Sequence, residues 1–193
     1  QFHVDNNADV TVAAYVVPSC EAHQFGCIAT DESGRITDFV EKPAVPPEIP
    51  GKPGYSFVSM GTYIFEREIL EESVFADNEK KDSTHDFGRD ILPSLYKSYK
   101  LMAYDFSTNV LPGDDKPYWK DVGNIKAYWE AHMDLLHHPS ALSLYNSLWP
   151  IRTVSYSDPP GFTYPANDHS CSVDGCLRAE ASRVLGAYVR RSV

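Results

Sequence analysis

The sequence predicts an α/β fold, because strand-like and helix-like segments alternate along most of the chain. Two nearly continuous apolar, β-rich runs, residues 8–17 and 56–65, have the character of strands covered on both faces. Apolar residues at helical spacing mark residues 86–99 and 124–136. From Val173 onward, a small or aliphatic residue recurs every six positions, which is typical of a hexapeptide β-helix.

Shorter elements complete the pattern. Asp31-Glu32-Ser33-Gly34 has hairpin turn chemistry and joins two short strands. Pro93 interrupts its helical stripe and is expected to bend that helix. The remaining predicted elements are strands at residues 25–30, 35–40 and 101–106 and a helix at residues 66–75.

The character of the chain changes in its last third. Residues 140–170 are rich in Ser, Pro, Tyr and Asp with little periodicity, and they are predicted to be a linker. Residues 171–193 are predicted to begin a β-helix that turns Val173, Ala179 and Leu185 inward. The alternative is an irregular tail with chance spacing. Three hexads make about one coil, which is too little for a stable β-helix, so the chain is expected to stop inside a domain.

Composition and charge limit the classes of function that the chain is expected to have. With 17 basic and 27 acidic residues, the net charge is -10. This argues against a general binder of nucleic acid or anionic membranes, which needs a basic face. The four cysteines lack the close pairs of a zinc site and are predicted to be reduced, as in a cytosolic enzyme. The start has neither an initiating Met nor signal-peptide character, so the chain is expected to begin inside a longer protein.

Glu41 and Lys42 end a predicted strand and are followed by Pro43. The lysine offers a mobile point charge for a phosphate, and the glutamate accepts hydrogen bonds from hydroxyl groups. An exposed pair of this kind is also common as solvated surface. The sequence therefore predicts a site here only in combination with other segments.

Three further positions suit a ligand, each with a structural alternative. Gly26 would let a ligand approach the backbone closely, or it would serve a turn. Ser59, with Gly61 two residues on, would present its hydroxyl to a ligand or satisfy it locally. Asp121 would hold Mg²⁺ together with substrate phosphate oxygens, or it would cap the helix that begins near Asn124.

Other catalytic patterns are missing from the sequence. Asp86 is predicted to cap the helix that it opens rather than to form a catalytic pair with His85. The seven histidines show no metal-ligand spacing, and there is no nucleophile elbow and no P-loop lysine motif.

Taken in order, these segments resemble bacterial ADP-glucose pyrophosphorylases (glucose-1-phosphate adenylyltransferases) over nearly the whole chain. The Glu-Lys-Pro run is shared by many sugar-nucleotide pyrophosphorylases. The His-Asp-Phe-Gly, Tyr-Trp-x-Asp-Val-Gly and Trp-Pro-Ile-Arg segments together are much more specific to the ADP-glucose branch. The matching stretches are residues 25–26, 39–43, 59–61, 83–88, 118–123 and 149–153.

The resemblance implies both a reaction and a site. ATP and glucose 1-phosphate would be joined into ADP-glucose and pyrophosphate, which supplies glycogen synthesis. Residues matching Gly26, Glu41, Lys42 and Ser59 contact glucose 1-phosphate in that family, the lysine through its phosphate. The residue matching Asp121 is a Mg²⁺ ligand. Lys42 and Asp121 are therefore the implied catalytic residues.

The resemblance also implies which parts of the family's fold the chain holds. Residues 1–139 match the C-terminal, sugar-phosphate half of the nucleotidyltransferase domain, a Rossmann-like mixed and mainly parallel sheet. Residues 171–193 match the start of a left-handed hexapeptide β-helix. The ATP-binding half would precede Gln1, so an open apolar sheet edge is expected, and so is failure to make ADP-glucose alone. A cytoplasmic, allosterically regulated homotetramer is the family expectation.

Three alternatives remain open. The same chemistry with another base would give UDP- or dTDP-glucose. A non-catalytic regulatory subunit would keep the fold, although Lys42 and Asp121 speak against it. The Tyr and Trp content suggests a carbohydrate-binding module, but Trp129 lies on an apolar helical stripe and is expected to be core.

Overall fold

The structure is a computed structural model that describes residues 1–137, 142–154, 156–166 and 170–193. These residues form two units, residues 1–109 and residues 110–193. The predicted boundary between residues 139 and 140 lies outside the described residues. Within them, no helix is both long enough and apolar enough to cross a membrane.

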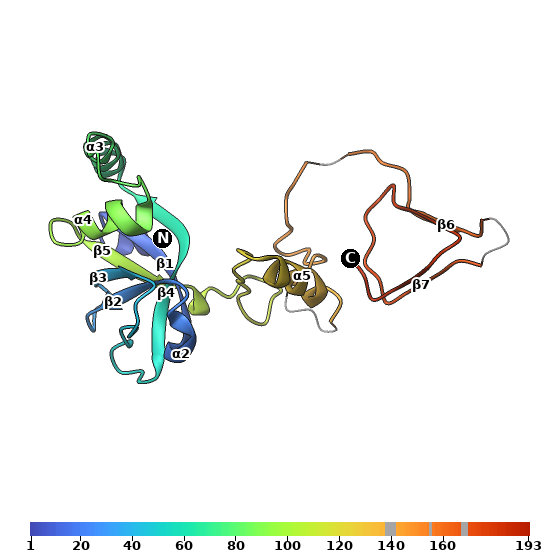
Figure 1. The fold of residues 1–193 in the computed structure, drawn as a ribbon, viewed down its shortest axis with the longest axis horizontal. Coiled ribbons are helices and arrows are strands. Elements are labelled where there is room, and N and C mark those ends of the chain that lie inside the picture. The colour runs from blue at the N-terminus through green and yellow to red at the C-terminus, as the bar shows by residue number, and fades with distance from the viewer. Residues whose placement is uncertain (138–141, 155, 167–169) are drawn as a thin grey trace. The chain divides into compact units, whose positions relative to one another are not determined.

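The first unit is built on a five-stranded sheet with the strand order β3-β2-β4-β1-β5 (Figure 1). It is mixed, as predicted, but it is mainly antiparallel rather than mainly parallel, because β1 and β5 are its one parallel pair in the part of the chain that the structure describes. The hairpin connection of β2 and β3 makes their pairing antiparallel. The strands are β1 (Val10–Pro18), β2 (Gly26–Thr30), β3 (Ile36–Glu41), β4 (Tyr55–Phe65) and β5 (Leu101–Asp105).

The two outer strands of this sheet approach each other. The amide of Ala103 in β5 donates a 2.9 Å hydrogen bond to the carbonyl of Gly34, in the turn before β3. Arg35 and Met102 form an antiparallel bridge beside it. Gly34 has a φ of +80°, a left-handed conformation that glycine adopts without strain and that this turn requires.

The open edge that was expected lies on β4. Within the described ranges, β2 pairs with β4 only at Phe57 and Val58, so residues 59–65 have β1 on one side and no strand on the other. Ile64 in this segment is 54% exposed. The edge is therefore apolar as well as unpaired.

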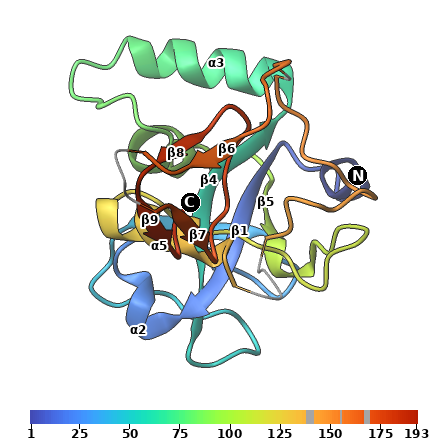
Figure 2. The same ribbon diagram turned by 90° about the vertical axis from the view of Figure 1, so that its right-hand side faces the viewer.

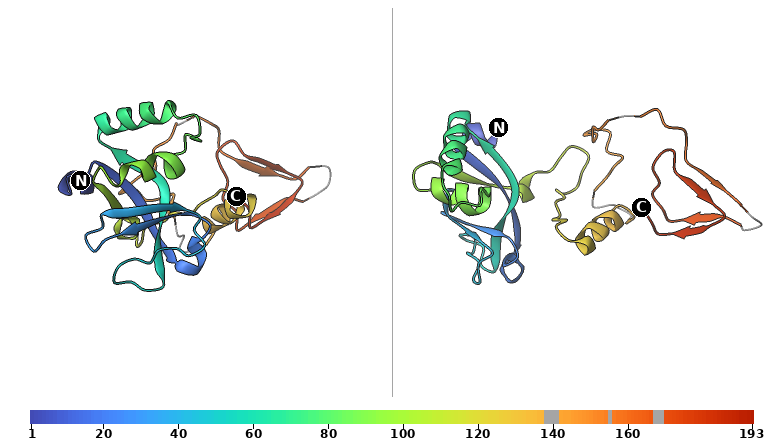
Figure 3. Two further views of the ribbon diagram at one scale, coloured as in Figure 1. Left: turned by 60° about the vertical axis from the view of Figure 1, so that its left-hand side comes forward. Right: turned by 45° about the horizontal axis from the view of Figure 1, so that its top comes forward.

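One face of the sheet carries the core. Val10, Val12 and Leu101 are fully buried there, against Leu92 of the short helix α4 (Leu92–Leu95). The longer helix α3 (Arg67–Asn78) lies on the same side of the sheet (Figure 3). Strong β propensity and continuous burial thus produce the strands that the sequence predicts.

The predicted helix at residues 86–99 is replaced by two short pieces. A π-helical turn, η1 (Phe87–Ile91), runs into α4, which ends at Leu95. Pro93 does not bend a continuous helix. It lies in the first turn of α4, where its missing N–H group is not needed. The remaining short helices of this unit are α1 (Phe2–Asp5), α2 (Ser19–Ala22) and η2 (Phe106–Thr108).

The second unit holds the helix α5 (Ile125–Asp134) and four strands of three residues each. β6 (Phe162–Tyr164) pairs in parallel with β8 (Arg183–Leu185), and β7 (Ser172–Asp174) pairs in parallel with β9 (Tyr188–Arg190), as Figure 2 shows. These are the elements of residues 110–193 that the described parts of the chain contain.

Two details of this unit differ from prediction. Leu185 is 52% exposed, and Ala179 is also exposed, so the inward residues are Val173, Val184 and Val189 at the centres of the short strands. The strict six-residue spacing fails because the turns between the strands differ in length. Trp129, expected to be core, is 57% exposed, because helical periodicity alone does not supply a partner surface.

Candidate functional site

Three of the predicted site residues line one pocket of the first unit. Gly26 of β2, Glu41 of β3 and Ser59 of β4 surround a cavity of about 410 Å³. The first residues of η1, Phe87 and Gly88, line the cavity as well. Its other lining residues are Phe39, Gly61, Tyr63, His85 and Asp86.

Position 26 favours glycine because two neighbouring side chains approach its Cα closely. The β2–β3 register sets Gly26 directly opposite Glu41. A Cβ atom at position 26 would lie 2.9 Å from Glu41 Oε2 and 3.1 Å from the Phe39 ring. Gly26 begins a strand and has no left-handed backbone, so the turn alternative is not observed, and the close neighbours of Gly26 are the side chains of Glu41 and Phe39.

Lys42 follows Glu41 but faces a different depression. Its backbone has a φ of +50°, and its N–H donates to the carbonyl of Phe25 at 2.9 Å. Its Nζ lies 3.8 Å from Glu41 Oε1, and its side chain is 58% exposed. Lys42 and Arg89 line an adjoining hollow of about 440 Å³, which shares Phe39, Glu41 and Gly88 with the pocket. Two cationic side chains at one rim suit an anion.

Ser59 lies where the strand pairing is interrupted. The β1–β4 register shifts opposite residues 60–62, and Gly61 there has a φ of +70°. The Ser59 hydroxyl accepts the Gly61 N–H at 3.2 Å and lies 3.5 Å from the hydroxyl of Tyr63. Local satisfaction and pocket lining, posed as alternatives, are both observed.

Two aromatic residues of the pocket were missed by the sequence reasoning. The rings of Tyr63 and Phe87 stack with centroids 5.6 Å apart at an angle of 26°. Burial raises the pKa of Tyr63 above its ordinary value, so its hydroxyl stays protonated at neutral pH. The signal for Tyr63 was its even spacing from Ser59, which puts both on one face of β4.

Cys27, beside Gly26, is buried, and its surroundings disfavour the thiolate form. Burial, with the nearby charge of Glu41, raises the pKa of its thiol to about 11. All four cysteines are free, as predicted.

The Asp86 cap is confirmed. Asp86 Oδ1 accepts the N–H groups of Gly88 at 2.8 Å and Arg89 at 2.9 Å. Asp90 holds the same loop from below: its Oδ2 accepts the Thr84 hydroxyl at 2.6 Å and the Asp86 N–H at 3.2 Å. These bonds fix the backbone at the mouth of the pocket.

As the pH is lowered, the loop that Asp90 holds is expected to lose its hydrogen bonds at a higher pH than the sheet unfolds. The hydrogen bond from the Thr84 hydroxyl, with that from the Asp86 amide, holds the pKa of Asp90 below its ordinary 3.8. Because the folded pKa is the lower one, the stabilisation is present above about pH 3.8 and is lost as pH falls through the folded value. The protection factor of the Thr84 amide, which corrects for the intrinsic effect of pH on exchange, should fall below that pH in the wild type. In Asp90→Asn the protection factor should be low at every pH, and an acid profile shared by both proteins would contradict the assignment.

Asp121 lies in the second unit and is exposed. The cap of α5 is Asn124, whose side chain accepts the Ala127 N–H at 2.9 Å, so Asp121 does not cap this helix. Tyr118 and Lys120 each donate to Asp134 of α5 at 3.0 Å, which anchors the segment before Asp121. Burial, with the bond to Asp134, raises the pKa of Tyr118 to about 12.

The described residues contain no group of three or more side chains that would hold a metal ion by themselves. A single exposed carboxylate such as Asp121 suits Mg²⁺ when phosphate oxygens and water supply the other ligands. By itself Asp121 offers one carboxylate oxygen ligand, and any divalent cation bound there would take its other ligands from outside the described side chains.

Comparison with known proteins identifies the family of the chain. Residues 1–138 match the family model described as nucleotidyl transferase. Glucose-1-phosphate adenylyltransferase of Photobacterium profundum is 42% identical over 193 residues, which are 100% of this chain and 48% of that protein. The enzyme of the same name from Nocardia farcinica is 49% identical over 99% of this chain and 47% of its own length. That from Thermus thermophilus is 43% identical over 100% of this chain and 48% of its own length.

The chain thus spans about half the length of the relatives it matches. The resemblance inferred from the sequence is confirmed over the whole chain. Because the family model matches residues 1–138, the chain belongs to the nucleotidyl transferase family.

Proposed function

We propose that this chain carries the sugar-phosphate side of a glucose-1-phosphate adenylyltransferase site. The observation that supports it most directly is the convergence of Gly26, Glu41 and Ser59 on one pocket, with Lys42 at its rim. The names of the relatives give the substrate class.

The pocket chemistry suits glucose 1-phosphate. Glu41 accepts hydrogen bonds from sugar hydroxyls, and the Ser59 hydroxyl both donates and accepts. The stacked rings of Tyr63 and Phe87 offer an apolar wall to the face of the sugar. Lys42 then meets the phosphate as a point charge.

The reaction would be an in-line attack of the sugar phosphate on the α-phosphorus of ATP, releasing pyrophosphate. Lys42 would orient the attacking phosphate and offset its negative charge. Asp121 would contribute a carboxylate to Mg²⁺, which, when bound, neutralises charge on the phosphates. No protein group needs to transfer a proton in this step.

The test is isothermal titration of the purified chain with glucose 1-phosphate, with and without Mg²⁺. Saturable binding is expected, with glucose 6-phosphate and inorganic phosphate binding at least about tenfold more weakly. Equal affinity for all three would reduce the site to a general anion site. The absence of any heat from a folded chain would contradict the proposal.

The chain alone is expected to form no ADP-glucose from ATP and glucose 1-phosphate. It matches only about half of each relative, and the residues proposed here serve the sugar phosphate rather than the ATP. Radiolabelled glucose 1-phosphate would detect the product. Turnover by the purified chain, lost in Lys42→Ala, would contradict this prediction.

Three wider features complete the proposal. The parallel three-residue strands with inward valines support the start of a left-handed β-helix at residues 171–193. The homotetramer rests on the family resemblance. A cytoplasmic setting is supported by the four free cysteines.

A further inference from the structure

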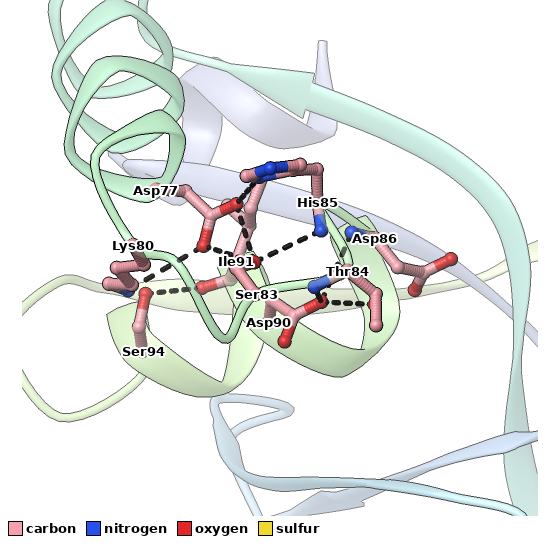
Figure 4. Close-up of polar contacts among 9 residues, drawn as sticks. All are labelled: Asp77, Lys80, Ser83, Thr84, His85, Asp86, Asp90, Ile91 and Ser94. Atoms are coloured by element: carbon pink, nitrogen blue, oxygen red, sulfur yellow. Dashed lines mark hydrogen bonds and ion pairs between the residues drawn. The ribbon is translucent and has the colours of Figure 1, made fainter.

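A buried carboxylate lies behind the pocket and takes no part in the chemistry proposed above. Asp77, in the last turn of α3, is 2% exposed. Its oxygens accept the Ser83 hydroxyl at 2.9 and 2.8 Å and His85 Nδ1 at 2.8 Å. Lys80 Nζ lies 3.6 Å away. Three donors thus converge on one carboxylate (Figure 4).

The side chains that Asp77 holds belong to the segment that shapes the pocket mouth. His85 has a φ of +60°, which a residue with a Cβ atom adopts only at a cost. Its N–H donates to the Ser83 hydroxyl at 3.0 Å, so Asp77 reaches the His85 backbone through Ser83 and the ring directly. Strained backbone persists where surrounding contacts fix it.

The position of this segment decides what lines the pocket. His85, Asp86, Phe87 and Gly88 follow one another along its wall. Asp90 holds the segment from η1, and Asp77 holds it from α3, so two elements fix its two sides (Figure 4). Without Asp77, only the η1 side would be fixed.

We propose that Asp77 is a positioning residue that fixes residues 83–86 so that His85 to Gly88 form the pocket wall. The part of this inference that concerns glucose 1-phosphate rests on the proposed function. The hydrogen bond from His85, aided by Ser83 and Lys80 against the cost of burial, keeps the pKa of Asp77 low. The carboxylate is therefore ionised at neutral pH, accepts hydrogen bonds from Ser83 and His85, and forms an ion pair with Lys80.

The test substitution is Asp77→Asn, which keeps the shape but replaces one acceptor by an amide that faces donors. Hydrogen exchange of the amides at residues 84–89 is expected to accelerate about tenfold, while those of β1 keep their protection. The affinity of the full 193-residue chain for glucose 1-phosphate should fall about tenfold. Glu68→Gln, an exposed carboxylate on the same helix, is the matched control and should change neither quantity.

A double-mutant cycle separates positioning from general destabilisation. If Asp77 acts through Ser83, the double variant Asp77→Asn/Ser83→Ala should bind glucose 1-phosphate as tightly as the single variant Asp77→Asn does. Additive losses would overturn the proposal. Should Asp77→Asn unfold the unit, Ser83→Ala alone carries the same exchange and affinity test without altering α3.

The remaining outcomes are equally decisive. Unchanged exchange at residues 84–89 in both variants would overturn the proposal. Faster exchange with unchanged affinity would also overturn it, because the segment would then not shape the site. If the wild-type chain fails to bind glucose 1-phosphate, the proposed function fails, and the exchange data alone confirm or reject the role of Asp77.

Discussion

Lys42→Ala is expected to weaken the binding of glucose 1-phosphate about a hundredfold, which corresponds to ~2.7 kcal/mol. A charge-assisted contact with phosphate is among the strongest polar interactions that a protein forms. Lys42 is mostly exposed, so removing its charge leaves the core untouched. Alanine and lysine bear the same backbone cost at a φ of +50°, so stability should barely change.

Titration calorimetry measures this loss, with Lys52→Ala as the control. Lys52 is an exposed lysine that lies over the ring of Tyr55, away from the pocket residues. Lys42→Arg should retain most of the affinity because it keeps the charge. If Lys42→Ala and Lys52→Ala behave alike, Lys42 does not contact the phosphate. Raising the salt concentration should reduce the difference between wild type and Lys42→Ala.

Gly26→Ala is expected to reduce the affinity for glucose 1-phosphate about tenfold while costing only about 1 kcal/mol of stability. The added methyl group would lie 2.9 Å from Glu41 Oε2, the mobile end of a side chain that can move away. Phe39 must yield only a few tenths of an ångström. The substitution therefore displaces the proposed hydroxyl acceptor without disrupting the sheet.

Comparing binding with thermal unfolding separates the two effects. Ala29→Gly, on the same strand, is a control for the change in backbone freedom and should leave the affinity unaltered. A Gly26→Ala variant that binds normally would show that Glu41 does not need its observed position. A variant that unfolds would show that Phe39 cannot adjust.

Much of the first unit could be predicted because its strands are encoded locally. The β-rich runs around Val12 and Val58 are buried wherever the sheet forms, so their assignment did not depend on knowing the partner strand. The predicted hairpin places Gly26 near Glu41, but it did not fix which residue of the second strand lies directly opposite Gly26. Their pairing is a register of two strands, which single residues do not specify.

Other features depend on contacts between distant residues. Asp77 looks like an ordinary helical carboxylate in the sequence, and its role emerges only when Ser83 and His85 fold back onto it. Tyr63 and Phe87, far apart in the chain, meet through the packing of η1 on β4. Which valines of the second unit point inward depends on the lengths of the turns between its strands, and the six-residue spacing did not reveal those lengths.

The half-paired strand β4 places an open sheet edge beside the pocket. In the described part of the chain, residues 59–65 have no strand partner along one edge, and Ser59 stands at the beginning of that edge. A strand that added there would extend the sheet beside the pocket. If that addition changed the affinity for the ligand, linkage would require the ligand to change the association constant by the same factor. The apparent dissociation constant for the ligand would then depend on the protein concentration.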